Sequence, residues 1–340
     1  MQTTGLAEQL HAVNRSINPA PSFLRRRAAN DAVASTEEPV RKPASGRRST
    51  AEPGWLQSAR RLRELSVAWE DNSGVLWTSM MPERRPSSTP SLLANVDGLL
   101  DCVERAWEEA GDGEAPIRYL VVSSRVPGIF NLGGDLPLFL DLISAGDGEG
   151  LRRYAHACIE IQHRLVINLD LPLTTIALVQ GDALGGGFEG ALAHEVIIAE
   201  RQARFGLPEV LFNMFPGMGA YSMLSRRLGP VQAKRMILSG RVFTAEEMHA
   251  MGVVDVLAED GAGETAVRAY IADAERSARA RRALFKAARM VDPITRGELL
   301  DITDLWVEAA LTLDDSDLRK MRHLAKAQDR RWARIKEAGF

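Results

Sequence analysis

The sequence has little of what marks secreted, metal-binding or membrane-spanning proteins. Its 340 residues include two cysteines, Cys102 and Cys158, without the CxxC or His-flanked spacing of metal and redox sites. No run approaches the roughly 20 apolar residues that a membrane span requires, and the N-terminus has no charged-then-apolar leader pattern. We therefore expect reduced thiols, no metal and no other cofactor, and a cytoplasmic location.

A strong net charge is also missing. Lys and Arg number 42 and Asp and Glu number 45, so the formal net charge is -3 and does not favour nucleic-acid binding. The two ends of the chain are basic and its middle is acidic. Basic ends are compatible with acidic partners, and equally with helical surfaces whose charges are simply solvated.

Composition divides the chain into three parts. Residues 17–54 are rich in Pro, Ser, Ala and Arg and have few spaced apolar positions, so we predict that residues 1–54 form a disordered extension. Such an extension is compatible with a targeting, regulatory or partner-binding role, or with none. Order is expected to begin near Leu62. Residues 55–261 then form the core with the active site, and residues 262–340 form a helical region that closes the pocket and supports oligomerisation.

The order of predicted elements indicates an α/β fold. Asp71–Gly74 is a polar turn between two apolar runs, which predicts a hairpin, and Thr89-Pro90 predicts a helix start. Apolar patterning predicts a helix over residues 150–169, and strands over 117–124, 174–181, 195–200 and 253–258. From about residue 262 the pattern is helical. Pro293 is expected to open one of these segments, with one face formed by Trp306, Val307, Ala310 and Leu311.

Two glycine-containing turns follow predicted strands. The first reads FNLGGDL over residues 130–136, and the second reads GGGFEG over residues 185–190 and opens a helix. Uncovered backbone N–H groups at such turns, with the partial positive charge of a helix N-terminus, suit an oxyanion. Each amide of an oxyanion hole contributes about 3–4 kcal/mol to catalysis. Glycines also serve tight strand-to-helix packing, so either turn alone is weak support.

Two glutamates accompany the turns. Glu189 lies three residues beyond Gly186, where a buried acid is costly unless it has a task or a partner. Glu209, in the segment GLPEV, lies at another strand-to-helix junction. Taken alone, Glu209 is an ordinary first-turn glutamate of a helix.

Together these motifs resemble the crotonase, or enoyl-CoA hydratase/isomerase, superfamily over roughly residues 62–340. The motifs occur in family order: FNLGGD, ALGGGFE, GLPEVLFNMFPGMGA at 206–220, and SGRVFTAEEMHAMGVVDVL at 239–257. The resemblance implies a spiral of ββα units with a C-terminal helical layer that assembles a homotrimer or hexamer. It also implies chemistry on an acyl thioester through a stabilised enolate.

The resemblance also implies roles for particular residues. Glu189 and Glu209 match the two hydratase glutamates, and the oxyanion amides fall on Leu132 or Gly133 and on Gly186. An apolar acyl pocket is expected, with candidate walls at Leu136, Phe139, Leu140, Phe188, Met214, Met218 and Trp306. His156, His163 and His194 form no triad or metal spacing, so we expect structural or exposed roles for them.

Within the superfamily the chain is most similar to diffusible signal factor synthases, which make cis-2-unsaturated fatty acid signals. Its Ala220–Met223 segment and its Leu171-Pro172 differ from ordinary hydratases, and Leu171 replaces a basic residue suited to a CoA phosphate. The resemblance thus implies dehydration of a medium-chain 3-hydroxyacyl group on acyl carrier protein to the cis-2-enoyl thioester. Thioester hydrolysis then releases a quorum-sensing fatty acid.

Two alternatives remain open. A CoA-dependent enoyl-CoA hydratase/isomerase of fatty-acid degradation would share both glutamates and both turns. A non-catalytic crotonase scaffold that binds a signalling partner, such as a sensor-protein regulator, belongs to another class. Retention of both acids favours an enzyme.

Overall fold

The first element of the structure precedes the predicted start of order. The computed structural model describes residues 52–111, 113 and 115–340, so nearly all of the predicted extension over 1–54 lies outside the described residues. Helix α2 (Gly54–Ala59) buries Trp55 and Leu56. Trp55 packs edge-on against Trp69, with ring centroids 5.2 Å apart. The prediction that order begins near Leu62 was wrong, because these apolar side chains find partners in the strand that follows.

The predicted hairpin and first long helix are confirmed. Strands β1 (Leu65–Glu70) and β2 (Val75–Met80) pair antiparallel across the 71–74 turn. Helix α3 (Pro90–Ala110) begins at the predicted cap, where the Thr89 side chain accepts a hydrogen bond from the Leu92 N–H. The cap satisfies one of the free amides at the helix start.

The strands form two sheets. The larger has the order β1-β2-β3-β5-β7-β10, and all its pairs after the hairpin are parallel. The smaller has the order β4-β6-β8-β9. The bounds are β3 (Tyr119–Ser124), β4 (Ile129–Asn131), β5 (Thr174–Val179), β6 (Asp182–Leu184), β7 (Val196–Glu200), β8 (Arg204–Gly206), β9 (Val242–Thr244) and β10 (Val256–Ala258). Every residue of β5 and β7 is buried, as expected for inner strands of a parallel sheet.

The two sheets are linked by a repeated ββα unit. In each repeat a strand of the larger sheet leads to a short strand of the smaller sheet and then to a helix. The repeats are β3-β4-α4, β5-β6-α6 and β7-β8-η3, where α4 is Leu136–Ser144, α6 is Gly186–Leu192 and η3 is the 3-10 helix Pro208–Phe212. The predicted α/β spiral is thereby confirmed. Each helix start of the repeat follows a strand of the smaller sheet, which brings the two glycine turns and Glu209 to one end of that sheet.

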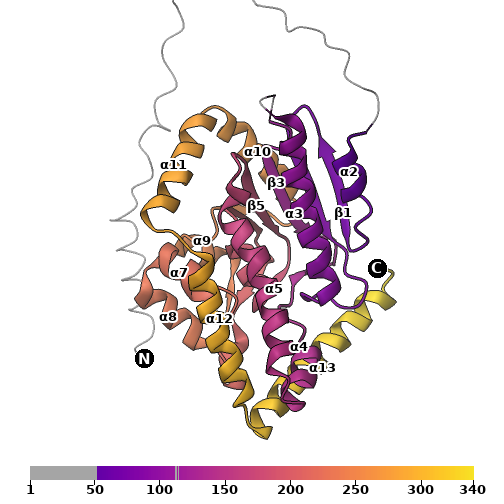
Figure 1. Cartoon of the computed structure of the whole chain (residues 1–340), viewed down its shortest axis with the longest axis vertical. Helices are drawn as coiled ribbons and strands as arrows, with labels where there is room; N and C mark the ends of the chain where they lie inside the picture. Colours follow the sequence, from indigo (N-terminus) through magenta and orange to yellow (C-terminus); the bar gives the residue numbers. More distant parts are fainter. Residues whose placement is uncertain (1–51, 112, 114) are drawn as a thin grey trace, which may run out of the picture. The chain divides into compact units, whose positions relative to one another are not determined.

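The remaining helices pack on the sheets or on other helices. They are α5 (Gly148–Val166), η2 (Asn168–Asp170), α7 (Ala220–Leu228), α8 (Pro230–Ser239), α9 (Ala245–Met251), α10 (Gly263–Glu275), α11 (Ala278–Val291), α12 (Arg296–Leu311) and α13 (Asp315–Glu337). Figure 1 shows α12 alongside α5 and α13 beside α4. No helix in the described ranges has the length and apolar character to cross a membrane.

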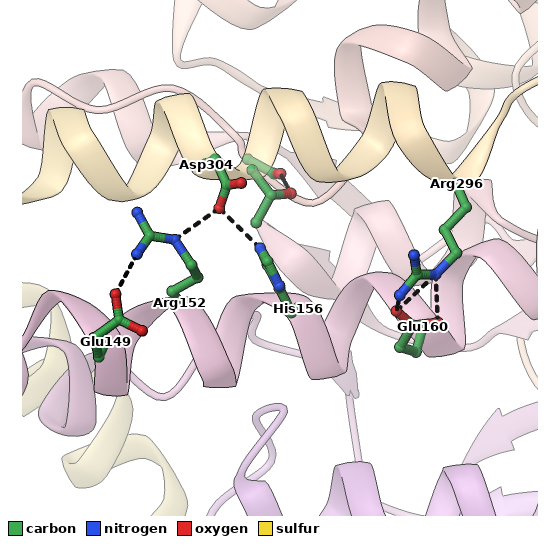
Figure 2. Close-up of polar contacts among 8 residues, drawn as sticks. Glu149, Arg152, His156, Glu160, Arg296 and Asp304 are labelled. Atoms are coloured by element: carbon green, nitrogen blue, oxygen red, sulfur yellow. Dashed lines mark hydrogen bonds and ion pairs between the residues drawn. The ribbon is translucent and has the colours of Figure 1, made fainter.

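A polar seam joins α5 to α12 (Figure 2). The Asp304 carboxylate accepts hydrogen bonds from Arg152 Nε at 3.0 Å and pairs with His156 Nε2 at 2.8 Å. Further along, the Arg296 guanidinium donates to both carboxylate oxygens of Glu160. These contacts are partly exposed, so each adds little stability. Together they fix the register of α12, which carries Trp306, against α5.

The C-terminal region is helical as predicted, with two local differences. Helix α12 begins at Arg296 with Thr295 as its capping residue, so Pro293 lies in the connection from α11 and does not open the helix. Trp306, Val307 and Ala310 are buried, whereas Leu311 is 41% exposed. Residues 293–295 form an irregular connection, and the side-chain cap of Thr295 places the helix start at Arg296.

Candidate functional site

The first glycine turn is held by hydrogen bonds from residues distant in sequence. The Leu132 N–H donates to the Pro86 carbonyl at 2.8 Å, and the Gly133 N–H donates to Asn131 Oδ1 at 2.8 Å. Gly133 has a φ of 93°, a backbone conformation that glycine adopts without strain. Both amides that the sequence suggested as oxyanion donors are therefore already engaged.

Gly134 supplies the free amide of this turn. Its N–H has no hydrogen-bond acceptor among the described residues, and Gly134 lines a largely apolar cavity. The adjoining carbonyl, that of Gly133, accepts a hydrogen bond from the Ser88 N–H at 2.7 Å. A hydrogen bond at one end of a peptide group polarises its other end, so the Gly134 N–H becomes a better donor. In the first turn the free amide is therefore that of Gly134 and not that of Leu132 or Gly133, which the sequence suggested.

The second turn supplies a matching amide. The Gly185 N–H donates to the Gly206 carbonyl at 2.8 Å, whereas the Gly186 N–H, at the start of α6, has no acceptor within the described part of the chain. A methyl group added to Gly186 would lie 3.4 Å from the Gly134 nitrogen. The two turns therefore meet, and two free amides lie at one point of the cavity wall.

Glu189 lies one helical turn beyond this point and is 1% exposed. Its Oε1 accepts hydrogen bonds from the Met218 N–H at 2.8 Å and from the Ala220 N–H at 3.0 Å. Burial raises the pKa of Glu189 well above its usual range, although the two N–H donors favour the ionised form and oppose that rise. The segment 217–220 thus orients the carboxyl group.

Glu209, in η3, shares the cavity with Glu189. Glu209 as a whole is half-buried. Its Oε2 atom is fully buried and has no hydrogen-bond partner in the part of the chain described here. Burial, and secondarily the charge of Glu189, raise the pKa of Glu209. The Oε1 atom lies beside the second turn, 2.6 Å from where a methyl group on Gly185 would stand. Two nearby acids with raised pKa values can divide proton donation and proton acceptance between them.

The cavity around the two acids is largely apolar and has a volume of about 130 Å³. Of the predicted acyl-pocket residues, four line it: Leu136, Phe139, Met218 and Trp306. The other three, Leu140, Phe188 and Met214, are buried in the surrounding core and lie outside the lining. Phe188 packs instead against Phe205, with ring centroids 5.3 Å apart.

Several lining residues were missed by the sequence analysis. Leu92 and Val96 of α3, and Ile161 and Leu165 of α5, extend the apolar wall. Their helical spacing indicated burial but could not separate cavity wall from core. On α6 the lining residues Gly186 and Gly190 are four positions apart and lie on one face of the helix, and His194 lines the cavity just beyond its end.

His194 closes one part of the cavity wall. It is 3% exposed, and its Nδ1 lies 2.8 Å from the Gly190 carbonyl, which makes Nδ1 the protonated nitrogen. Burial lowers the pKa of His194 to about 4, so the ring is neutral at physiological pH. Its Nε2 has no partner among the described residues, and the ring also lines a second, surface cleft with Arg226 and Arg227.

The described ranges show neither an ionised cysteine in the cavity nor a metal centre. Cys158 lines it, but burial raises the pKa of this thiol to about 12, so it remains protonated. Both cysteines are free and buried. No cluster of His, Cys, Asp or Glu that could hold a metal ion occurs in the part of the chain that the structure describes.

A comparison with protein families agrees with this geometry. The model of the enoyl-CoA hydratase/isomerase family matches residues 99–296, which carry both turns and both glutamates. The chain belongs to this family. Residues beyond the match include most of α12, with Trp306, and all of α13.

Curated relatives at about one-third identity are hydratases. The mitochondrial methylglutaconyl-CoA hydratase of Rattus norvegicus is 33% identical over 202 residues, 58% of this chain and 59% of the relative. That of Mus musculus is 32% identical over 232 residues, 66% of this chain and 69% of the relative. The chain thus spans somewhat over half to about two thirds of these relatives.

Solved structures share the fold over most of this chain. DspI of Pseudomonas aeruginosa has a TM-score of 0.57 and 27% identity, covering 74% of this chain and 93% of DspI. The human mitochondrial delta3-delta2-enoyl-CoA isomerase has a TM-score of 0.62 over 82% of this chain and all of the isomerase chain. At 20% identity the isomerase supports the fold alone.

Proposed function

We propose that this chain dehydrates a medium-chain 3-hydroxyacyl group held as a thioester on acyl carrier protein, and then hydrolyses the resulting cis-2-enoyl thioester. The observation that carries the proposal is the pair of buried carboxyls, Glu189 and Glu209, in one apolar cavity with the free amides of Gly134 and Gly186. Released cis-2-unsaturated fatty acid would act as a diffusible signal, as the similarity to diffusible signal factor synthases implies.

In the first step the thioester carbonyl oxygen accepts hydrogen bonds from the Gly134 and Gly186 amides. One glutamate, as carboxylate, removes a proton from the α carbon, and the developing enolate charge is stabilised by the two amides. The other glutamate, as carboxylic acid, protonates the 3-hydroxyl group, so the C–O bond breaks and water leaves. A pair of acids with raised pKa values holds both required protonation states near neutral pH.

In the second step water replaces the carrier. A glutamate carboxylate takes a proton from water as its oxygen attacks the thioester carbon, and the same two amides hold the tetrahedral oxyanion. Collapse breaks the C–S bond, and the thiol of the carrier leaves with a proton. The products are one free cis-2-enoic acid and one free thiol. Both steps therefore use one oxyanion hole and one carboxyl pair.

The lining favours a plain hydrocarbon chain. The lining of the cavity includes no Lys or Arg in the described ranges, so a carboxylate at the far end of an acyl group would lack a charge partner. The methylglutaconyl group named for the curated relatives carries such a carboxylate.

A homotrimer or hexamer is part of the proposal. Helix α11 buries none of its residues and exposes Leu284, Met290 and Val291. An amphipathic helix whose apolar side chains face solvent requires a covering partner, and a second copy of this chain supplies one. Light scattering coupled to gel filtration measures the assembly. A monomeric wild-type protein contradicts this part of the proposal.

The experiment that tests the function compares carriers. The full chain is incubated with 3-hydroxydodecanoyl thioesters of acyl carrier protein and of CoA, and products are identified by mass spectrometry. We expect free cis-2-dodecenoic acid from the carrier-protein substrate. Glu189→Gln and Glu209→Gln each remove most of that product, because one proton transfer is lost.

The comparisons also support a second candidate, a CoA-dependent hydratase, since the curated relatives at 32–33% identity bear that name. Rapid reversible hydration of 2-enoyl-CoA without free acid favours this candidate and contradicts ours. The third candidate is a non-catalytic scaffold that binds a sensor-protein regulator. Unchanged signal production by cells that carry both glutamate substitutions favours that scaffold.

A further inference from the structure

Positive charge is concentrated in the last helix. Between Arg319 and Lys336 the sequence has eight Lys or Arg residues and one acid, Asp329, although the whole chain has a net charge of -3. Part of this charge is compensated. Arg331 pairs with Asp182 at 2.5 Å, and Lys320 pairs with Asp317 at 2.9 Å.

Four of the remaining cations form a ridge. Arg322, Lys326, Arg330 and Arg334 recur every four residues on α13, and all four side chains are exposed. None of the four has an ion pair or side-chain hydrogen bond within the described part of the chain. We call these four residues the basic ridge. Side chains with this spacing lie on neighbouring turns, so their charges add at the surface.

The helix that bears the ridge is attached to the candidate site. Gln328 Nε2 donates a hydrogen bond to the Leu132 carbonyl in the first turn at 3.1 Å. Arg331 donates to the Gly128 carbonyl at 2.9 Å, and Arg85 contacts both Asp135 and Asp329. The C-terminal helix therefore lies directly beside the turn that presents the Gly134 amide.

The same helix forms part of the cavity rim. Leu324 and Gln328 line the cavity and are themselves partly exposed, as is Ser88 in the neighbouring loop. We place the mouth of the cavity beside these residues. The basic ridge lies across the helix from them, a distance of about 10–12 Å, the diameter of a helix with its side chains.

We propose that the basic ridge is the docking surface for the acidic acyl carrier protein whose thioester enters the cavity. This inference rests on the proposed function, since it assumes a carrier-linked substrate. An acidic protein matches the charge of the ridge, and attraction between opposite surface charges raises association rates 10- to 1,000-fold, an effect that salt suppresses. Docking there brings the prosthetic arm to the mouth of the cavity.

The surface does not match a membrane or its lipids. An interfacial helix buries large apolar side chains between its cations. Within Asp315–Glu337 no large hydrophobic side chain is exposed. The ridge therefore offers charge without an apolar anchor, which suits a soluble acidic partner.

The test removes the ridge and leaves the cavity unchanged. The variant carries Arg322→Gln, Lys326→Gln, Arg330→Gln and Arg334→Gln, since Gln retains helix propensity. The matched control carries four Gln substitutions at exposed cations away from α11 and α13, namely Arg61 and Arg63 before β1 and Lys234 and Arg235 on α8. We expect the ridge variant to raise KM for 3-hydroxydodecanoyl carrier protein at least tenfold at low salt, with kcat little changed. Turnover of the matching N-acetylcysteamine thioester should be unaffected.

Binding separates failure of docking from failure of the function. Association of fluorescent holo acyl carrier protein is measured by anisotropy at 50 and 300 mM NaCl, which requires no turnover. We expect wild type and control to bind in a salt-sensitive manner and the ridge variant to bind at least tenfold more weakly. Equal binding by the ridge variant and wild type overturns docking, even if the enzyme is active. Tighter binding of wild type to phosphatidylglycerol vesicles than to the carrier protein also overturns it.

Discussion

The two substitutions Glu189→Ala and Glu189→Gln should separate the structural role of this residue from its chemical one. Glu189 Oε1 accepts two buried backbone N–H groups, those of Met218 and Ala220. Alanine leaves both donors without a partner, and each unsatisfied buried donor costs about 1–3 kcal/mol, so the loss is about 2–6 kcal/mol. Glutamine keeps an oxygen at the same position. We expect Glu189→Gln to fold with nearly wild-type stability at pH 5 and Glu189→Ala to be less stable by that amount.

Urea denaturation at pH 5 measures the free energy of unfolding of the three proteins, and the dehydration assay measures their activity. At pH 5 the wild-type carboxyl is largely protonated because its pKa is raised, so glutamine is a fair isostere. Both variants should lose most activity, since neither can transfer the proton. Equal stability of the Ala and Gln variants would refute the reasoning, because it would mean that the two N–H groups find other partners. Full activity of Glu189→Gln would refute the chemical role.

Three further predictions concern neighbouring positions. Because the folded-state pKa of Glu209 is raised, its protonated form stabilises the fold at low pH, and this contribution is lost as pH rises from about 4.5 through the raised value. The free energy of unfolding of Glu209→Gln should therefore equal that of the wild type near pH 4. Above neutrality it should be larger, by about 1.4 kcal/mol for each unit by which folding raises the pKa of Glu209. A constant difference in unfolding free energy between the two proteins at all pH values contradicts this. Gly187→Ala would place a methyl group 2.1 Å from the Asn131 carbonyl oxygen, so it should cost about 1–3 kcal/mol in urea denaturation and lower kcat more than raise KM. His194→Ala should open the cavity toward the second cleft. In a series of substrates of increasing chain length, the preferred acyl chain should become longer by about two to four carbons, since each methylene changes discrimination measurably. An unchanged chain-length preference contradicts a role of His194 in setting that length.

Local signals in the sequence predicted much of the fold. The polar turn at 71–74 and the Thr89-Pro90 cap act over a few residues, and both lie where expected. Strands β5 and β7 were recognisable because each carries an uninterrupted run of four apolar residues. The three-residue strands of the smaller sheet were not, since three residues carry too little pattern, and α2 was missed because its apolar side chains are few and lie beside a polar segment.

The sequence likewise predicted some features of the candidate site and not others. Glycine turns beside glutamates are visible as motifs, and the structure brings Glu189, Glu209 and Gly186 to one cavity. Which amide remains free in the first turn depends on Pro86, 46 positions before Leu132, and on the rotamer of Asn131. No spacing rule predicts such a choice. Likewise, apolar residues of α4, α6 and η3 look alike in sequence whether they face the cavity or the core.

The choice of carrier has to be decided outside the cavity. Carrier protein and CoA present the same phosphopantetheine thioester to the glutamates, so residues around the reacting atoms cannot distinguish them. Ala220 and Ser222 are positions where this sequence departs from ordinary hydratases. The Ala220 backbone N–H donates to Glu189, a contact that almost any residue provides, and Ser222 is buried. Those departures bear on the carboxyl group and its helix rather than on the carrier. Residues that could distinguish the two carriers lie outside the mouth, on the far side of α13, which presents the unpaired cations. Substitution there, with the cavity intact, is therefore the perturbation most directly sensitive to carrier identity.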